Sequence, residues 1–194
     1  MRKPGITPGT IRVGSSVLQF GIGRYLGGLA VALLLSAEPA AAELVGGVFA
    51  HDIHTPLDKS GQEHGVDLHL GWRGDPITAL KAIGSPAPHL YVIANTAGDT
   101  SFAVAGIDWK LGGNVYVRPG IGLAVHDGPR SGHASPDRID FGSRVLFAPE
   151  LGVGVQAGRR TSVELSWVHF SHAQLFSRQN PGTDSFGVRL NFRY

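Results

Sequence analysis

The sequence has 194 residues and a nearly balanced charge, with 17 lysine and arginine residues against 15 aspartate and glutamate residues. It contains no cysteine, which excludes a small exported domain held together by disulfide bonds. Four of the basic residues and one acidic residue lie within the first 42 positions, so the remaining chain is close to neutral. The composition therefore does not indicate an electrostatic nucleic-acid-binding surface.

The N-terminal segment has the three parts of a secretory signal peptide. Basic residues precede an apolar run at 29–35, and three consecutive alanines follow at 40–42. The apolar run is too short to cross a membrane as a helix, although an uncleaved anchor is the alternative. The sequence therefore predicts a signal peptide over residues 1–42 and a single mature domain over residues 43–194.

The mature part of the chain shows short alternating segments rather than a sustained helical stripe. Apolar and polar residues alternate with the period of two that is typical of β-strands, and Gly, Pro, Asp and Asn separate the segments. Eight strands are predicted, at 44–51, 64–74, 88–97, 100–110, 113–126, 142–156, 160–171 and 184–194. Eight is the smallest common strand number of bacterial outer-membrane barrels. We therefore predict an all-β fold, an eight-stranded antiparallel transmembrane β-barrel in the bacterial outer membrane.

The two faces of the predicted strands differ in a way that indicates which one contacts lipid. In the segment 113–126 one face carries Val, Ile and Leu, whereas the other combines Tyr116, Arg118 and His126 with glycine and alanine. A soluble barrel would present a uniformly polar second face to water. Small residues with single charges instead suit the narrow interior of an eight-stranded barrel. We therefore expect the apolar face to contact lipid.

The connections between strands are expected to alternate between long outer loops and short periplasmic turns. The long polar segments are 52–63, 75–87 and 127–141, and the short links lie near 98–99, 111–112 and 157–159. This arrangement places the end of the strand at 160–171 at the outer rim of the barrel. It also places the C-terminal aromatic residue, Tyr194, in an interfacial girdle at the opposite end.

Three residues with the chemistry of a hydrolase triad lie at the ends of the last two predicted strands. His169 and Ser171 are two positions apart, so both side chains point to the same apolar face as Trp167. A histidine can take the proton of a serine hydroxyl, and Asp184, on the neighbouring antiparallel strand, can orient the imidazole. Glu164 has the opposite parity and is expected inside the barrel. Polar side chains on a lipid-facing strip are costly, which favours a functional role over that of rim residues.

The segment His169-Phe170-Ser171-His172-Ala173 is followed by Asn180-Pro181-Gly182-Thr183-Asp184-Ser185 and a final alternating strand. This stretch resembles the PagL-type lipid A 3-O-deacylases, which carry a His-x-Ser-Asn-Ala motif. The resemblance is specific over about residues 165–194 and implies an outer-membrane, eight-stranded hydrolase. It assigns the base to His169, the nucleophile to Ser171 and the orienting acid to Asp184.

The resemblance also implies a substrate and its surroundings. The substrate would be the lipid A part of lipopolysaccharide, which would lose the ester-linked 3-hydroxyacyl chain at position 3 by a serine esterase mechanism. Asn180, Gly182 and His172 would bind the oxyanion or the substrate. The protein would lie in outer-membrane lipid and require no metal, no cofactor and no nucleic acid. Homodimerisation is left open.

Two positions depart from the pattern of this family. His172 stands where the family has asparagine, and the acid is Asp184 where the family has glutamate. The segment before Asp184 is also one residue longer. A shorter carboxylate must approach the histidine from a closer backbone, although aspartate serves in most triads of this kind.

Two other classes of function remain open from the sequence. A non-enzymatic eight-stranded outer-membrane barrel, an adhesin or a structural protein, would act through its extracellular loops, whereas a soluble exported barrel would bind a ligand in its interior. His51-Asp52-Ile53-His54 contains residue types that bind metals. Adjacent loop histidines are nevertheless more often solvated than metal-bound, and no further ligand follows them.

Overall fold

The structure is a computed structural model that describes residues 42–57, 62–130 and 136–194, so residues 1–41 of the predicted signal peptide lie outside the described residues. The strands are β1 (Glu43–Ala50), β2 (Val66–Arg73), β3 (Ala87–Asn95), β4 (Phe102–Asp108), β5 (Leu111–Gly112), β6 (Val115–His126), β7 (Val145–Gln156), β8 (Thr161–Phe170) and β9 (Thr183–Arg193). A 3-10 helix, η1 (Thr78–Ile83), lies between β2 and β3. Within the described ranges, no helix has the length and hydropathy needed to cross a membrane.

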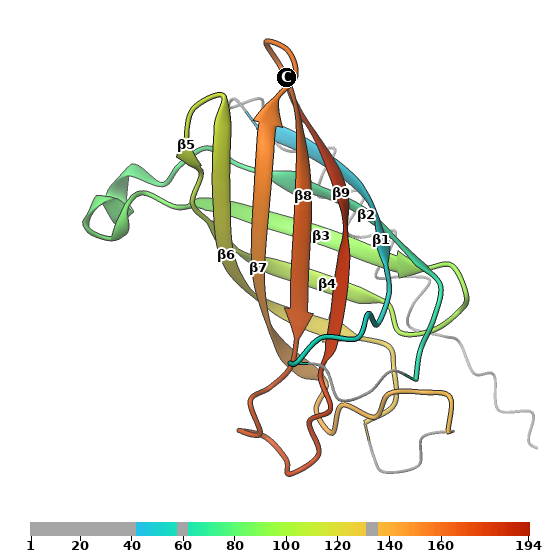
Figure 1. Cartoon of the computed structure of the whole chain (residues 1–194). Helices are drawn as coiled ribbons and strands as arrows, with labels where there is room; N and C mark the ends of the chain where they lie inside the picture. The colour runs from blue at the N-terminus through green and yellow to red at the C-terminus, as the bar shows by residue number, and fades with distance from the viewer. Residues whose placement is uncertain (1–41, 58–61, 131–135) are drawn as a thin grey trace, which may run out of the picture.

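Eight long antiparallel strands close into a barrel (Figure 1). They pair in the order β4-β3-β2-β1-β9-β8-β7-β6, and the pairing of β4 with β6 closes the sheet. The two-residue strand β5 only extends the hairpin between β4 and β6. A closed sheet has no unpaired edge, so the backbone polar groups are satisfied without water, as a lipid bilayer requires. The predicted eight-stranded antiparallel barrel is confirmed.

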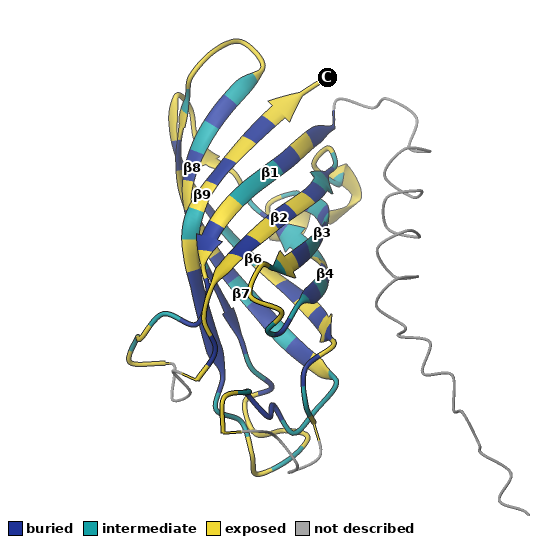
Figure 2. Ribbon diagram, turned by 90° about the vertical axis from the view of Figure 1, so that its right-hand side faces the viewer, coloured by how far each residue is buried: buried dark blue, intermediate teal, exposed yellow. Residues whose placement is uncertain are grey.

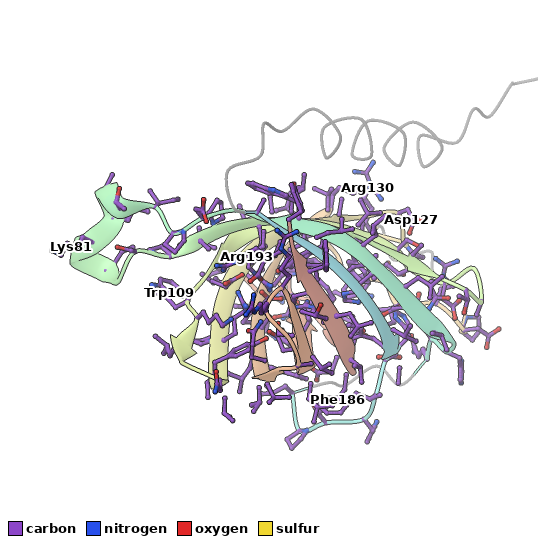
Figure 3. The ribbon with its side chains drawn as sticks, turned by 90° about the horizontal axis from the view of Figure 1, so that it is seen from above. Lys81, Trp109, Asp127, Arg130, Phe186 and Arg193 are labelled. Carbon is purple, nitrogen blue, oxygen red and sulfur yellow. The ribbon has the colours of Figure 1, made fainter. Side chains whose placement is uncertain are left out.

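The apolar face of the strands lies outside the barrel, as predicted. Along β6, Val115 and Leu123 are 67% and 54% exposed, whereas the intervening Tyr116 and Arg118 are buried. Figure 2 shows the same alternation as exposed and buried bands along several strands. Looking along the barrel, Figure 3 shows Phe186 of β9 on the outside of the wall. The outer surface is therefore the apolar one.

Charged side chains fill the middle of the barrel and the half nearer the C-terminus. Three arginines are buried with carboxylates as partners, in the pairs Arg73–Asp108 at 2.6 Å, Arg118–Glu164 at 3.0 Å and Arg189–Glu150 at 2.8 Å. Small residues on the same face make room for them. A Cβ atom on Gly154 would lie 2.2 Å from the ring of Tyr116, and one on Gly152 would lie 2.5 Å from Glu164. The glycines of the inner face are therefore required by the narrow interior.

In the other half of the interior, aromatic side chains pack beside the buried ion pairs of His51. Phe102 of β4 stacks on Phe170 of β8 across the barrel, with ring centroids 4.0 Å apart, and Phe141 meets Phe102 edge-on. All three rings are almost completely buried. Because Phe170 lies between His169 and Ser171 in the chain, this packing fixes the end of β8.

The connections gather at two ends of the barrel. The end named here the loop end carries residues 51–57, 62–65, 96–101, 127–130, 136–144 and 171–182. The C-terminal end carries the segments 74–86, 109–114 and 157–160 together with Tyr194 (Figure 1). The expectation that all long connections lie at one end is wrong. Segment 74–86, which contains η1, lies at the C-terminal end, whereas the short turn 96–101 lies at the loop end.

The physical reason is that successive connections of an antiparallel barrel must alternate between its ends, whatever their lengths. The long segment 74–86 has its own local structure. Gly84 closes η1 in the left-handed conformation with φ of +90°, and the indole of Trp109 donates a hydrogen bond to the carbonyl of Ile83 at 2.7 Å. Figure 3 shows this segment extending beyond the barrel wall, with Lys81 near its tip and Trp109 near its base.

Candidate active site

The three predicted site residues meet at the loop end, on the outside of the barrel wall. His169 and Asp184 are direct partners across the ladder between β8 and β9. Ser171 follows β8 and is held against β7 by two backbone hydrogen bonds with Phe147, of 2.7 and 3.2 Å. The flanking Val168 and Phe170 belong to the interior core, so His169 and Ser171 point away from it.

The side chains form a continuous chain of hydrogen bonds through the imidazole of His169. Its Nδ1 atom lies 3.0 Å from Oδ1 of Asp184, and its Nε2 atom lies 3.0 Å from Oγ of Ser171. The carboxylate and the hydroxyl therefore contact different nitrogens of the imidazole ring, which is the arrangement of a serine-hydrolase triad. Direct pairing of His169 with Asp184 brings the two backbones close enough for an aspartate to make the contact.

Asp184 has two further side-chain partners that the sequence analysis did not identify. The indole Nε1 of Trp167 donates to Oδ1 at 2.8 Å, and the hydroxyl of Thr55 donates to Oδ2. The backbone N–H of Ile53 also donates to the carbonyl oxygen of Asp184 at 2.8 Å. Segment 53–55 thus covers Asp184 from outside, and the carboxylate is fully buried although it lies on the outer face.

A pocket of about 450 Å³ opens beside this chain of hydrogen bonds. Its walls come from the loops after β1 and β8 and from the end of β8, namely Pro56, Leu57, His169, Ser171, Ala173, Gln174, Asn180, Pro181 and Gly182. A Cβ atom on Gly182, which has φ of +74°, would lie 3.1 Å from Cε1 of His169. A glycine is therefore needed for the loop to approach the imidazole this closely.

The turn after Ser171 has an uncommon backbone. Ala173 and Gln174 both have positive φ, at +51° and +59°, and both line the pocket. Successive N–H groups in a turn of this kind can form a concave site for a negative charge. The side-chain oxygen of Asn180 accepts a hydrogen bond from the backbone N–H of His172 at 2.9 Å, which ties the two sides of the loop together.

The structure does not bring His172 to the pocket, so its predicted contact with the oxyanion or substrate is not supported by its position. The side chain is completely buried, with Nε2 2.8 Å from the carbonyl oxygen of Phe141 and 2.9 Å from that of Gln179. His172 continues the inward parity of Val168 and Phe170, and it links the loop after β8 to the segment before β7.

Comparisons with known proteins identify the family to which the chain belongs. A family model described as "Lipid A 3-O-deacylase (PagL)" matches residues 66–193, which include His169, Ser171 and Asp184. The chain belongs to this family. It is accordingly an enzyme of the PagL family and an outer-membrane β-barrel, as the resemblance in sequence implied.

One solved structure shares the fold of this PagL-family chain, and two others align with it at lower similarity. The crystal structure of the outer membrane enzyme PagL is 21% identical, with a TM-score of 0.56, and the alignment covers 77% of this chain and 98% of that one. A de novo designed transmembrane β-barrel (9% identity, TM-score 0.45) and the outer membrane protein Ail of Yersinia pestis (10%, 0.44) also align, over 80% and 79% of this chain and 98% of each of theirs. No curated protein matches the sequence. None of these comparisons supports a homodimer.

His51 and Asp52, two of the metal-binding residue types noted in the sequence, have other partners in this PagL-family chain. His51 lies inside the barrel, with Nδ1 2.9 Å from Asp67 and Nε2 3.0 Å from Glu63. Burial lowers the pKa of His51, but the hydrogen bonds and charges of the two carboxylates outweigh it and raise the pKa to about 9. His51 is therefore a buried cation that carries two ion pairs. Among the described residues, His89, Asp108 and Glu150 form a cluster of ligand types, and they belong to the arginine ion-pair network.

Proposed function

We propose that this chain removes the ester-linked 3-hydroxyacyl chain at position 3 of lipid A by a Ser-His-Asp mechanism. The observation that carries the proposal is the chain of hydrogen bonds from Asp184 through His169 to Ser171, on the apolar outer face of the barrel rather than in its interior. An esterase placed there can receive a substrate whose acyl chains stay in the membrane. An adhesin or a structural barrel would not need this arrangement.

The positions of the three side chains support the following reaction. Ser171 Oγ attacks the ester carbonyl as its proton passes to Nε2 of His169, while Asp184 stabilises the resulting imidazolium. The tetrahedral intermediate then expels the sugar oxygen, which takes this proton from His169 and leaves as a hydroxyl group. Water, deprotonated by the same imidazole, hydrolyses the acyl-enzyme and releases the 3-hydroxy fatty acid. The proton that His169 takes from water passes to Ser171 Oγ as the acyl-enzyme breaks down, so the three side chains end the cycle in their starting protonation states.

The turn after Ser171 is proposed to stabilise the negative charge of the intermediate. The backbone N–H groups of Ala173 and Gln174 follow the nucleophile in a left-handed turn beside the pocket. Preorganised backbone donors of this kind contribute about 3–4 kcal/mol to the stability of an oxyanion. Asn180 supports the turn through the N–H of His172 and also lines the pocket.

The apolar surface below the pocket offers a path for the acyl chain. Leu165, Phe186 and Val188 are 53%, 46% and 43% exposed on the outer faces of β8 and β9, in line with His169 and Asp184. We propose that the loop end faces the cell exterior, where lipopolysaccharide lies. Export would follow from cleavage of the signal peptide after Ala42, so that the mature chain begins at Glu43.

The test uses the purified barrel in detergent with lipopolysaccharide as substrate. Mass spectrometry of lipid A should show the loss of one 3-hydroxyacyl chain with the native protein and no loss with Ser171→Ala, whose far-UV circular dichroism spectrum should match that of the native protein. Unchanged lipid A with native, folded protein would contradict the proposed function. Loss of the chain with Ser171→Ala would contradict the assignment of the nucleophile.

A further inference from the structure

A short segment before the family match holds the proposed catalytic acid from outside. Residues 51–55, named here the strap, leave the end of β1 and cross over the first residues of β9. Ile53 N–H donates to the backbone carbonyl of Asp184 at 2.8 Å, and the Thr55 hydroxyl donates to its Oδ2. The family match begins at residue 66, so the strap lies outside it.

The hydroxyl of Thr55 is itself held in place. The backbone N–H of Leu57 donates to Thr55 Oγ1 at 3.1 Å. Since a hydroxyl has one proton and accepts through its lone pairs, this bond leaves the proton for Asp184. Leu57 and the preceding Pro56 also line the pocket, so the strap joins the carboxylate directly to the pocket wall.

The base of the strap is anchored in the barrel interior. Asp52 has a φ of +50° and accepts hydrogen bonds from the Thr183 hydroxyl at 2.9 Å and from the N–H groups of Gln62 and Glu63 at 2.8 and 3.0 Å. His51 is fixed between Glu63 and Asp67, as described above. The strap therefore starts from a rigid, buried base rather than from a free loop.

Both neighbours of Asp184 are held from the opposite side of β9. Thr183 binds Asp52, and the Ser185 hydroxyl donates to Asp67 Oδ2 at 2.9 Å. Hydrogen bonds inside the barrel thus fix the backbone of β9 on either side of the acid. These bonds leave the rotation of the carboxylate group about the Cβ–Cγ bond (χ2) undetermined. This torsion has only a broad intrinsic preference.

We propose that Thr55 is a positioning residue that fixes this rotation, with Trp167 as the second donor; this inference rests on the proposed function of Asp184. Asp184 Oδ1 accepts hydrogen bonds from His169 Nδ1 and Trp167 Nε1, and Oδ2 accepts one from the hydroxyl of Thr55. A carboxylate bound at both oxygens presents Oδ1 to the imidazole at all times. Without Thr55, the carboxylate turns and the imidazole loses its orientation towards Ser171.

The experiment compares Thr55→Val, which has the same shape without the donor, with Thr55→Ser, which keeps the donor. Thr161→Val on β8 at the C-terminal end is the matched control, and Trp167→Phe removes the second donor while keeping an aromatic ring. The first readout is the rate at which a fluorophosphonate probe labels Ser171, which requires an activated hydroxyl but no lipid A. The second is kcat and KM for removal of the acyl chain from lipopolysaccharide.

Thr55→Val and Trp167→Phe should each lower both the labelling rate and kcat by roughly tenfold or more, the loss expected from one hydrogen bond to a charged group. KM should stay within about twofold of the native value, because the substrate contacts are unchanged. Thr55→Ser and Thr161→Val should behave like the native protein. A native labelling rate for Thr55→Val, or an equal loss for the folded Thr55→Ser, would overturn the proposal.

The two proposals fail in different ways. If native protein labels at Ser171 but leaves lipid A intact, the proposed substrate is wrong, while the labelling rates still decide the role of Thr55. If Thr55→Val does not fold, as judged by its circular dichroism spectrum, Trp167→Phe provides the same test of a donor to Asp184, and native labelling by that variant would overturn the proposal.

Discussion

His169 and Asp184 are direct cross-strand partners on β8 and β9, and the distance from Nδ1 to Oδ1 is 3.0 Å. This pairing places an aspartate at the position where the resemblance to the PagL family implies the longer glutamate. Because the two Cα atoms face each other across the ladder, the shorter side chain reaches the imidazole without distortion. The register of two strands thus compensates for one missing methylene group.

Replacing Asp184 with asparagine should remove catalysis while leaving the fold in place. The amide preserves the volume but no longer stabilises the imidazolium and favours the wrong tautomer of His169, a change that costs about 10⁴ in kcat in a comparable triad. The measurement is kcat for acyl release, with the thermal unfolding midpoint as control. Activity within a few-fold of native would mean that Asp184 is not the acid of the triad.

Gly182→Ala should impair activity more than stability. The added Cβ would lie 3.1 Å from His169 Cε1, and the residue has φ of +74°, which costs a non-glycine residue about 1–2 kcal/mol. We expect a modest decrease in the free energy of unfolding and a larger fall in kcat, because the imidazole must shift. Gly98→Ala, at φ of +85° with open space around its Cβ position, is the matched control for backbone strain alone. Equal effects of the two variants on activity would contradict this reasoning.

The loop end should be most stable in mildly acidic solution. The pKa of His51 is raised from 6.5 to about 9, so its stabilising contribution is complete below pH 6.5 and is lost as the pH rises through 9. The pKa of Glu63 is lowered from 4.5 to about 2, although burial opposes this, because His51, Thr100 and Ile139 bind its charged form. Its contribution is complete above pH 4.5 and is lost as the pH falls through 2.

Hydrogen exchange of the backbone N–H groups in segment 51–65 provides the measurement. Protection should be highest between about pH 4.5 and 6.5 after correction for intrinsic exchange, and it should fall between about pH 6.5 and 9. In His51→Gln this fall between about pH 6.5 and 9 should disappear. A native profile that is flat from pH 6 to 10 would show that His51 does not bind as a cation.

Leu165→Arg distinguishes a membrane barrel from a soluble one. Leu165 is 53% exposed near the middle of β8, so in water the substitution would have little effect. In a bilayer, arginine near the midplane costs about 2–4 kcal/mol, whereas near the interface it costs about 0–1 kcal/mol. Reversible unfolding in phospholipid vesicles should therefore show a large loss for Leu165→Arg and a small one for Thr161→Arg, at the end of the same strand. Equally small decreases in the free energy of unfolding for both variants would contradict the position of Leu165 in the lipid-facing middle of the barrel.

Much of the fold and three of the site residues could be predicted because both depend on the period of two in a strand. Parity alone places His169, Ser171 and Asp184 on one face and Glu164 on the other, and antiparallel pairing brings the ends of β8 and β9 together. The same parity indicates that His172 points inward, and that signal was overlooked in favour of the family motif.

The remaining features depend on contacts that leave no local pattern. Thr55 reaches Asp184 across 129 positions of sequence, and nothing in the loop around it indicates that contact. Loop length was a poor guide to the end of the barrel at which segment 74–86 lies, since strand direction decides that question. The donor role of Trp167 was also missed, because an aromatic residue on a lipid-facing strip has an ordinary explanation as a packing residue.

The interior of the barrel determines what this protein does to the membrane that holds it. Arg73, Arg118 and Arg189 are nearly inaccessible and paired with carboxylates, and stacked phenylalanine rings and the ion pairs of His51 occupy the other half. A barrel whose interior is packed in this way has no room for a porin-like channel. The barrel can therefore lie in the outer membrane without forming a channel through it, and the proposed chemistry takes place on the outside of the wall.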